Sequence, residues 1–234
     1  MSKNTMPLHK EAWIEDLAIK IFNEIEALTK DKVGVSRESY GKGETISINY
    51  MIDLAKEFGF YIEKDAAANV YLSLEKSTKN NHILIGSHID SVPQGGNFDG
   101  LAGVIAGFLI LVYLKEKKVK TPLPIKLLVL RGEESAWYGK NCIGSKALFG
   151  LISQEDLNSI HRSNGKKLSK AMTESGVKLD QIIKCKTLIN KNEVEAFIEI
   201  HIEQGPILVD KNWPIAVVTG IRGNYRHHKI RCKG

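Results

Sequence analysis

Apolar residues recur at the spacing of an amphipathic helix near the N-terminus. Trp13, Leu17, Ile21 and Ile25 follow one another every four residues, which places them on one helical face. The apolar run at residues 101–114 is too short to cross a bilayer and is typical of a buried helix. The helices predicted in this way cover residues 9–30, 45–58 and 101–117, and residues 141–183 are predicted to be mostly helical.

Short aliphatic runs predict buried strands at residues 82–86 and 125–132, which read HILIG and IKLLVLRG. Residues 196–205 alternate instead, with Glu199 and His201 on one face and isoleucines on the other. Further strands are predicted as a pair within residues 61–75 and singly at residues 213–223. Strands that alternate with helices favour an α/β domain with a mixed, largely parallel sheet and helices on both faces.

Composition and charge narrow the possible partners. The chain has 234 residues, 43% hydrophobic and 26% charged, which is ordinary for a globular protein. Its net charge is +6, but the basic residues are interleaved with 27 acidic ones, and only KEKKVK at 115–120 is dense. We therefore expect no nucleic-acid partner.

The cysteines and the N-terminus bear on the compartment. The three cysteines lie far apart and form no C-x-x-C pair, which argues against a disulfide framework or a thiolate zinc site. The N-terminal segment contains no apolar stretch that resembles a secretory signal. We expect a cytoplasmic protein without membrane association.

Polar residues follow the strand predicted at 82–86. His88 and Asp90 are two positions apart and point the same way, so Asp90 could hold one imidazole nitrogen while the other binds a metal. Asp99, in the glycine-rich GGNFDG, could cap the next helix, bind a metal, or do both. Taken alone, each is better explained as an ordinary polar strand end or helix cap.

Further candidates follow the other predicted strands. Glu133 and Glu134 are adjacent carboxylates at the end of a buried strand, where like charges repel, although an exposed acidic turn explains them equally well. His201 lies between Glu199 and Glu203 on one predicted face; a lone histidine there is more often structural, but such a row needs solvent or a cation.

Taken together, these residues predict a metal centre. The set without thiolates that suits zinc, manganese or cobalt consists of His88, Asp99, Glu134 and His201. Glu133 could accept a proton from a metal-activated water, whose pKa falls to about 7. The sequence thus indicates metal-assisted hydrolysis of a carbonyl or amide bond.

Four stretches closely resemble the binuclear-metal amidohydrolases of the N-carbamoyl-L-amino-acid hydrolase type. This group includes allantoate amidohydrolase and β-ureidopropionase, within the aminoacylase/carboxypeptidase-like metallopeptidase clan. The stretches are DAAANV (65–70), GSHIDSVPQGGNFDGLAGV (86–104), GEES…GSKALFG (132–150) and EIHIEQGPIL (199–208). HIEQG is the most discriminating of them, and the resemblance implies the phosphorylase/hydrolase-like catalytic fold of the clan.

The resemblance also implies roles for the matching residues. Asp99 would bridge two divalent metal ions (zinc, manganese or cobalt), with His88 and His201 completing one ion and Glu134 serving the other. Glu133 would be the general base. Asp90 would orient His88, and Gln204 would face the substrate.

The chain departs from the family pattern in three respects. Ala68 stands where a glycine is usual, which could strain a turn. Residues 135–138 read SAWY instead of a pattern such as GSRF, which could alter the substrate branch. Family members are also nearly twice as long, so we interpret residues 1–212 as part of an incomplete catalytic domain. Residues 213–234 would begin a truncated lid and dimerisation domain.

The missing half would carry the last histidine of the Glu134 metal site, along with substrate-binding residues. His227 and His228 lie too early to replace that histidine, so one metal site is expected to be incomplete. The homodimer that the resemblance implies would depend on the same missing part.

The predicted function is hydrolysis of a linear amide C–N bond, removing a carbamoyl (ureido) group from a small N-carbamoyl amino acid or allantoate-like substrate. Two alternatives stay open. One is an aminoacylase or dipeptidase of the same clan, and the other is an inactive, truncated remnant of the amidohydrolase. The sequence indicates neither the individual substrate nor the native metal.

Overall fold

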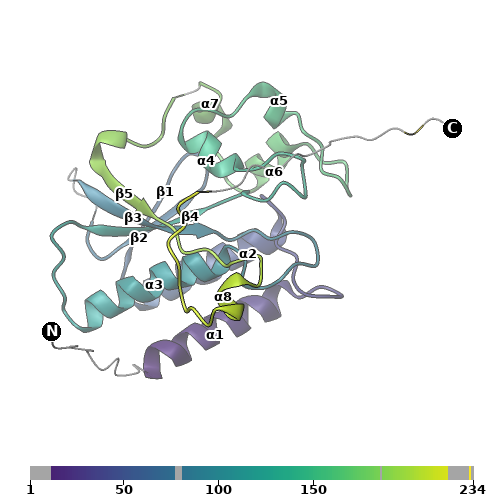
Figure 1. Ribbon diagram of the computed structural model, residues 1–234. Helices are drawn as coiled ribbons and strands as arrows, with labels where there is room; N and C mark the ends of the chain where they lie inside the picture. The colour runs from purple at the N-terminus through teal and green to yellow at the C-terminus, as the bar shows by residue number, and fades with distance from the viewer. Residues whose placement is uncertain (1–11, 77–80, 185, 221–231, 233–234) are drawn as a thin grey trace. The chain divides into compact units, whose positions relative to one another are not determined.

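The computed structural model describes residues 12–76, 81–184, 186–220 and 232 (Figure 1). Contacts divide the chain into two units, Met1–Ile202 and Glu203–Gly234. The predicted boundary between residues 212 and 213 stays a prediction. None of the helices in the described ranges combines the length and apolar character needed to cross a lipid bilayer.

The centre of the first unit is a mixed sheet with the strand order β1-β2-β4-β3-β5. β3 pairs in parallel with β4 and β5, whereas β1, β2 and β4 pair in antiparallel fashion. The strands are β1 Tyr61–Lys64, β2 Val70–Ser73, β3 His82–His88, β4 Ile125–Leu130 and β5 Val194–Ile198. The predicted mixed, largely parallel sheet is therefore confirmed.

Helices cover both faces of this sheet (Figure 1). On one face, α1 Ala12–Thr29, α2 Lys42–Glu57 and α3 Leu101–Glu116 enclose the main core with Ile85 and Leu127 of the sheet. On the other face, Leu84 and Leu128 contact Leu148 of a group of short helices. These are α4 Ile143–Leu148, α5 Gln154–Leu157, α6 Leu168–Glu174 and α7 Leu179–Ile182. Successive side chains of β3 and β4 point to opposite faces of the sheet, so the same two strands contribute to both cores.

Most predicted elements form close to their expected bounds, but two strands do not. The strand predicted at 196–205 ends at Ile198, and the next residue, Glu199, accepts a side-chain hydrogen bond from Ser87 of β3. Within the described part of 213–223, which stops at residue 220, no strand forms. Residues 141–183 are helical only in the four short segments α4–α7.

Ala68 and the basic run at 115–120 each occupy a defined place in the fold. Ala68, in the turn between β1 and β2, has a φ of 60°, so the predicted strain is real, and such a conformation costs about 1 kcal/mol for a residue with a Cβ. In the basic run at 115–120, Lys115 donates to the Phe58 carbonyl and lies 5.7 Å from the centre of the Phe60 ring. That lysine therefore joins α3 to the end of α2.

In the second unit, the described regular structure consists of α8 Ile207–Asp210. The backbone N–H of Leu208 donates to Glu203 Oε2 at 2.7 Å and so closes the start of this helix. The predicted substrate-facing residue Gln204 belongs to this unit, and its role stays a prediction. His227 and His228 lie outside the described residues.

Candidate metal centre

His88, the last residue of β3, is buried and held in one orientation. Its Nδ1 lies 3.0 Å from the carbonyl oxygen of Asp90, and since a carbonyl only accepts, Nδ1 must carry the proton. Gly100 has a φ of 65°, and a Cβ there would lie 2.4 Å from the imidazole ring. Glycine at this position therefore leaves the space that the ring occupies.

His201 reaches the same place from the segment that follows β5. Its Nδ1 lies 2.9 Å from the carbonyl oxygen of Ile202, so Nδ1 likewise carries a proton. Its Nε2 lies 3.2 Å from Asp99 Oδ1, and Nε2 of His88 lies 3.7 Å from that same oxygen. Two imidazoles therefore direct their Nε2 atoms at one carboxylate oxygen.

This convergence fits a divalent cation. A neutral imidazole Nε2 and an ionised carboxylate oxygen are both acceptors, so a cation or a proton must lie between them. Ligand atoms of His88, Asp99 and His201 all lie within 4.8 Å of one another. Two nitrogen donors and a carboxylate suit zinc, manganese or cobalt.

Negative charge accumulates around His88. Burial favours its neutral form, but Asp90, Glu133 and Asp99 outweigh burial and raise the pKa of His88 to about 9. Burial together with Glu133 also raises the pKa of Glu134 to about 7. A site that attracts protons this strongly would attract a divalent cation for the same electrostatic reason.

Glu133 and Glu134 lie in the turn after β4 and form a second set with His88. One ligand atom from each of these three residues lies within 4.8 Å of the others. Among the described residues, the structure thus groups Glu134 with His88 and Glu133, and that group does not include Asp99. Glu133 Oε1 also accepts a hydrogen bond from the Cys142 thiol at 3.3 Å.

Asp90, which the sequence predicts to orient His88, also contacts the turn after β4. Its side chain is fully buried, and Oδ1 lies 3.4 Å from His88 Nδ1. The same oxygen accepts from the backbone N–H of Glu133 at 2.9 Å, and Oδ2 accepts from the N–H of Glu134 at 3.0 Å. Burial would raise the pKa of Asp90, but His88 and these donors keep it below its usual value. The Asp90 carboxylate therefore links the end of β3 to the turn after β4.

Arg37 is an important residue that the sequence did not reveal. It is fully buried and donates through Nε to the carbonyl of Ile89 at 2.6 Å and through Nη1 to Asn97 Oδ1 at 2.9 Å. The guanidinium thus ties together the two ends of the loop between His88 and Asp99. A single arginine in a polar segment carries no periodicity or motif that could have indicated this role.

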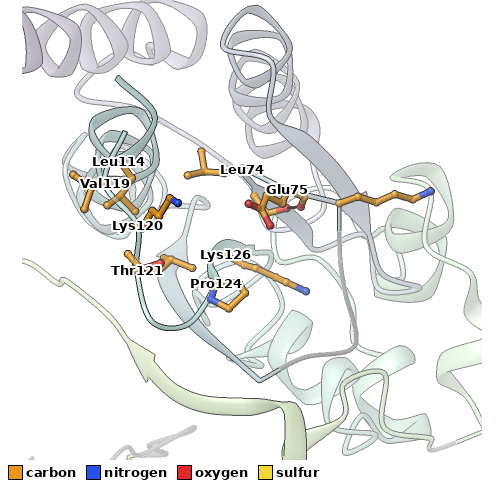
Figure 2. A pocket seen from close by; sticks show the side chains of 11 residues that line it. Leu74, Glu75, Leu114, Val119, Lys120, Thr121, Pro124 and Lys126 are labelled. Atoms are coloured by element: carbon orange, nitrogen blue, oxygen red, sulfur yellow. Dashed lines mark hydrogen bonds between the residues drawn. The ribbon is translucent and has the colours of Figure 1, made fainter. Parts of the chain in front are cut away.

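A separate cavity of about 310 Å³ lies away from these residues (Figure 2). Its lining includes Leu74 and Glu75 after β2, Leu114 near the end of α3, and Lys126 near the start of β4. His88 instead ends β3, and the Glu133–Glu134 turn follows β4. Since none of the candidate ligands lines this cavity, it has no part in the metal centre.

Comparisons with known proteins point to one family. The sequence pattern described as peptidase family M20/M25/M40 matches residues 84–230. An uncharacterized hydrolase of Haemophilus influenzae is 35% identical over 195 residues, which are 82% of this chain and 46% of that protein. An N-carbamoyl-L-amino acid amidohydrolase of Geobacillus stearothermophilus is 34% identical over 191 residues, again 46% of its length and 81% of this chain.

A solved structure shares the fold. The hydantoinase/carbamoylase family amidase from Burkholderia ambifaria superposes with a TM-score of 0.72 at 24% identity, over 84% of this chain and 47% of that one. This chain therefore spans about half the length of the proteins it matches.

Proposed function

Because the chain belongs to the peptidase family M20/M25/M40, we propose that its metal centre serves the hydrolysis of a linear amide C–N bond. The proposed reaction removes the carbamoyl group from an N-carbamoyl amino acid or an allantoate-like ureido compound. The resemblance to N-carbamoyl-L-amino acid amidohydrolases supports this substrate class. The observation that carries the proposal is the convergence of two imidazole Nε2 atoms on Asp99 Oδ1.

The residues divide into ligands and a base. His88, Asp99 and His201 would hold one divalent ion, and Glu134 would serve a second site. When bound, such ions polarise the scissile carbonyl and lower the pKa of water. Glu133 would accept the proton of the attacking water and pass it to the leaving nitrogen. Asp90 would keep His88 in its Nδ1–H tautomer and hold the backbone of Glu133 in place.

Replacement of Glu133 by glutamine tests this division. We expect Glu133→Gln to retain the bound metal, measured by elemental analysis after dialysis, and to lose at least about 100-fold in turnover because the base is gone. His201→Ala is the matched variant that should lose metal. Retained turnover in Glu133→Gln would remove Glu133 from the role of base.

A substrate panel separates the proposed reaction from its alternatives. The panel contains N-carbamoyl-L-amino acids, allantoate, N-acetyl amino acids and dipeptides, each assayed with zinc, manganese or cobalt. Faster release from the acetylated or dipeptide substrates would favour an aminoacylase or dipeptidase. Metal binding without hydrolysis of any substrate would favour the inactive remnant.

A further inference from the structure

The turn Arg131–Glu134 has an unusual arrangement of backbone hydrogen bonds. Four consecutive backbone N–H groups donate to side-chain oxygens from three distant segments. The acceptors are Asn69 Oδ1 for Arg131 (3.1 Å), Glu44 Oε1 for Gly132 (2.7 Å), Asp90 Oδ1 for Glu133 (2.9 Å) and Asp90 Oδ2 for Glu134 (3.0 Å). Exposed loops ordinarily leave such groups to water, so this turn is fixed by its surroundings instead.

The carbonyl side of the turn is fixed as well. The carbonyls of Arg131, Gly132 and Glu133 accept from the backbone N–H groups of Gly144, Ile143 and Cys142 at 2.9, 2.7 and 2.9 Å. With both sides of the backbone held, the directions in which the Glu133 and Glu134 side chains leave the turn are set in advance. Such fixed geometry is what a catalytic pair of carboxylates requires.

Among the side chains that accept hydrogen bonds from this turn, Glu44 lies farthest from it in sequence. It lies in the first turn of α2 with its side chain fully buried. Its Oε2 accepts from the backbone N–H of Tyr40 at 2.8 Å and from Nε of Arg131 at 2.6 Å, while Oε1 accepts from Gly132. All these partners are donors, as a carboxylate requires. Burial raises the pKa of Glu44 to about 7, with Arg131 opposing that change. One buried carboxyl group therefore connects a helix, a strand end and the turn.

The ion pair between Glu44 and Arg131 is not explained by a gain in the stability of the folded chain. Burying both partners is costly, and apolar residues of similar size often stabilise a protein as well or better. What an apolar side chain could not supply is an acceptor for the N–H of Gly132, the residue before Glu133. The geometry thus favours a role for Glu44 in placing the turn.

We propose that Glu44 is a positioning residue that aligns the Glu133–Glu134 turn through the peptide N–H of Gly132. The inference rests on the proposed function of that turn, but its first test does not need a metal or a substrate. The hydrogen bonds of Glu44 go to Tyr40, Arg131 and Gly132, none of which belongs to the residues grouped as ligands.

The test compares two variants that both remove the ion pair with Arg131. Glu44→Gln can still present an oxygen to Gly132, whereas Glu44→Met has similar length and no acceptor. Thr45→Val, which removes a different partner of Arg131, is the control. Hydrogen exchange of residues 131–134 is measured by mass spectrometry or NMR, with the β3 amides as internal reference. We expect exchange in the turn to rise at least about tenfold in Glu44→Met and less than about threefold in the other two variants.

Equal exchange in Glu44→Met and Glu44→Gln would overturn the proposal, because the acceptor at Gly132 would then have no effect. If Glu44→Met does not fold, Glu44→Asp takes its place: it keeps the charge but is one methylene too short to reach Gly132, and the same rise is expected.

Cobalt binding, followed by its visible absorption spectrum, provides the second readout. We expect Glu44→Met to weaken cobalt binding about 10- to 100-fold and Glu44→Gln to restore most of it. If the unsubstituted chain binds no cobalt while exchange in the turn still depends on the acceptor, the proposed function fails and the positioning role remains. Unchanged cobalt affinity in a Glu44→Met variant whose turn exchanges faster would overturn the link between alignment and metal binding.

Discussion

Arg37 shows how one buried charge can hold a loop that carries a metal ligand. Burial lowers the pKa of Arg37 to about 10, with Asp90 and Asp99 opposing that change, so the guanidinium stays protonated at neutral pH. Its planar fork bonds to acceptors at both ends of the loop between His88 and Asp99. A lysine has the same charge but cannot span these acceptors in fixed directions.

We therefore expect Arg37→Lys to destabilise the folded chain by about 2–4 kcal/mol. The free energy of unfolding, measured in urea, checks this value. Lys56→Ala is the control, because Lys56 pairs with Asp53 on the exposed surface of α2 and should change stability by less than about 0.5 kcal/mol. A loss below 1 kcal/mol in Arg37→Lys would show that the loop does not depend on the fork.

At the scale of single residues, the sequence indicated that His88, Asp99 and Glu134 would lie near one another, and their roles as ligands stay predictions. The supports Arg37 and Glu44 were not predictable. His88, Asp99 and Glu134 follow predicted strands or precede a predicted helix, so the local pattern indicated where they would meet. Arg37 and Glu44 act on partners more than 50 positions away in sequence, and no local pattern encodes such contacts. Buried charges of this kind become visible only in the folded chain.

At the scale of elements, α3 positions the site because one of its faces lies very close to the backbone next to His201. A Cβ on Gly103 would lie 2.3 Å from the carbonyl oxygen of Ile200 and 2.6 Å from the Cβ of Ser87. Gly107, one turn later, faces instead the methyl end of the Leu127 side chain at 2.7 Å. The first contact is with the backbone beside His201, and the second is with a side chain that can rotate.

The two glycines should therefore respond differently to alanine. Gly103→Ala is expected to displace the 200–201 backbone and weaken zinc or cobalt binding at least about tenfold, whereas Gly107→Ala should leave the affinity within about threefold. Isothermal titration gives the affinities, and thermal melts confirm that both variants fold. The same loss of affinity in both variants would indicate a general effect on the core.

Helices and buried strands were predictable from helical periodicity and from apolar runs, but the end of β5 was not. The alternating pattern continues to Glu203, yet the strand stops at Ile198. Beyond it, Ser87 donates to Glu199 Oε1 at 2.5 Å, so a contact with β3 takes precedence over the local preference. This turn is also what carries His201 toward Asp99.

At the scale of the molecule, β5 is an edge strand with apolar side chains in solvent. Among the described residues it pairs only with β3. Phe197 is 44% exposed and Ile198 is 53% exposed. Open edges with apolar side chains favour self-association, and the predicted homodimer and cytoplasmic location stay separate predictions.

We expect the purified chain to associate with increasing concentration, as measured by sedimentation velocity. Ile198→Lys should weaken this association at least about tenfold, because it removes apolar surface and adds charge at the edge. Glu195→Lys, on the same strand, changes charge without removing apolar surface and is the control. Equal association of the two variants would exclude the apolar edge as its cause.

The pairing of β3 with β5 also bears on the order in which the chain folds. Ser87 and Glu199, which meet beside the site, are 112 residues apart in sequence. His88, Asp99 and Glu134 lie on neighbouring elements, whereas His201 can join them only after this long loop has closed, and loop closure must precede the contacts that reward it. During synthesis, the nascent chain would therefore complete its sheet before it acquired the last of the proposed imidazole ligands, so capture of the proposed metal would come at the end of folding.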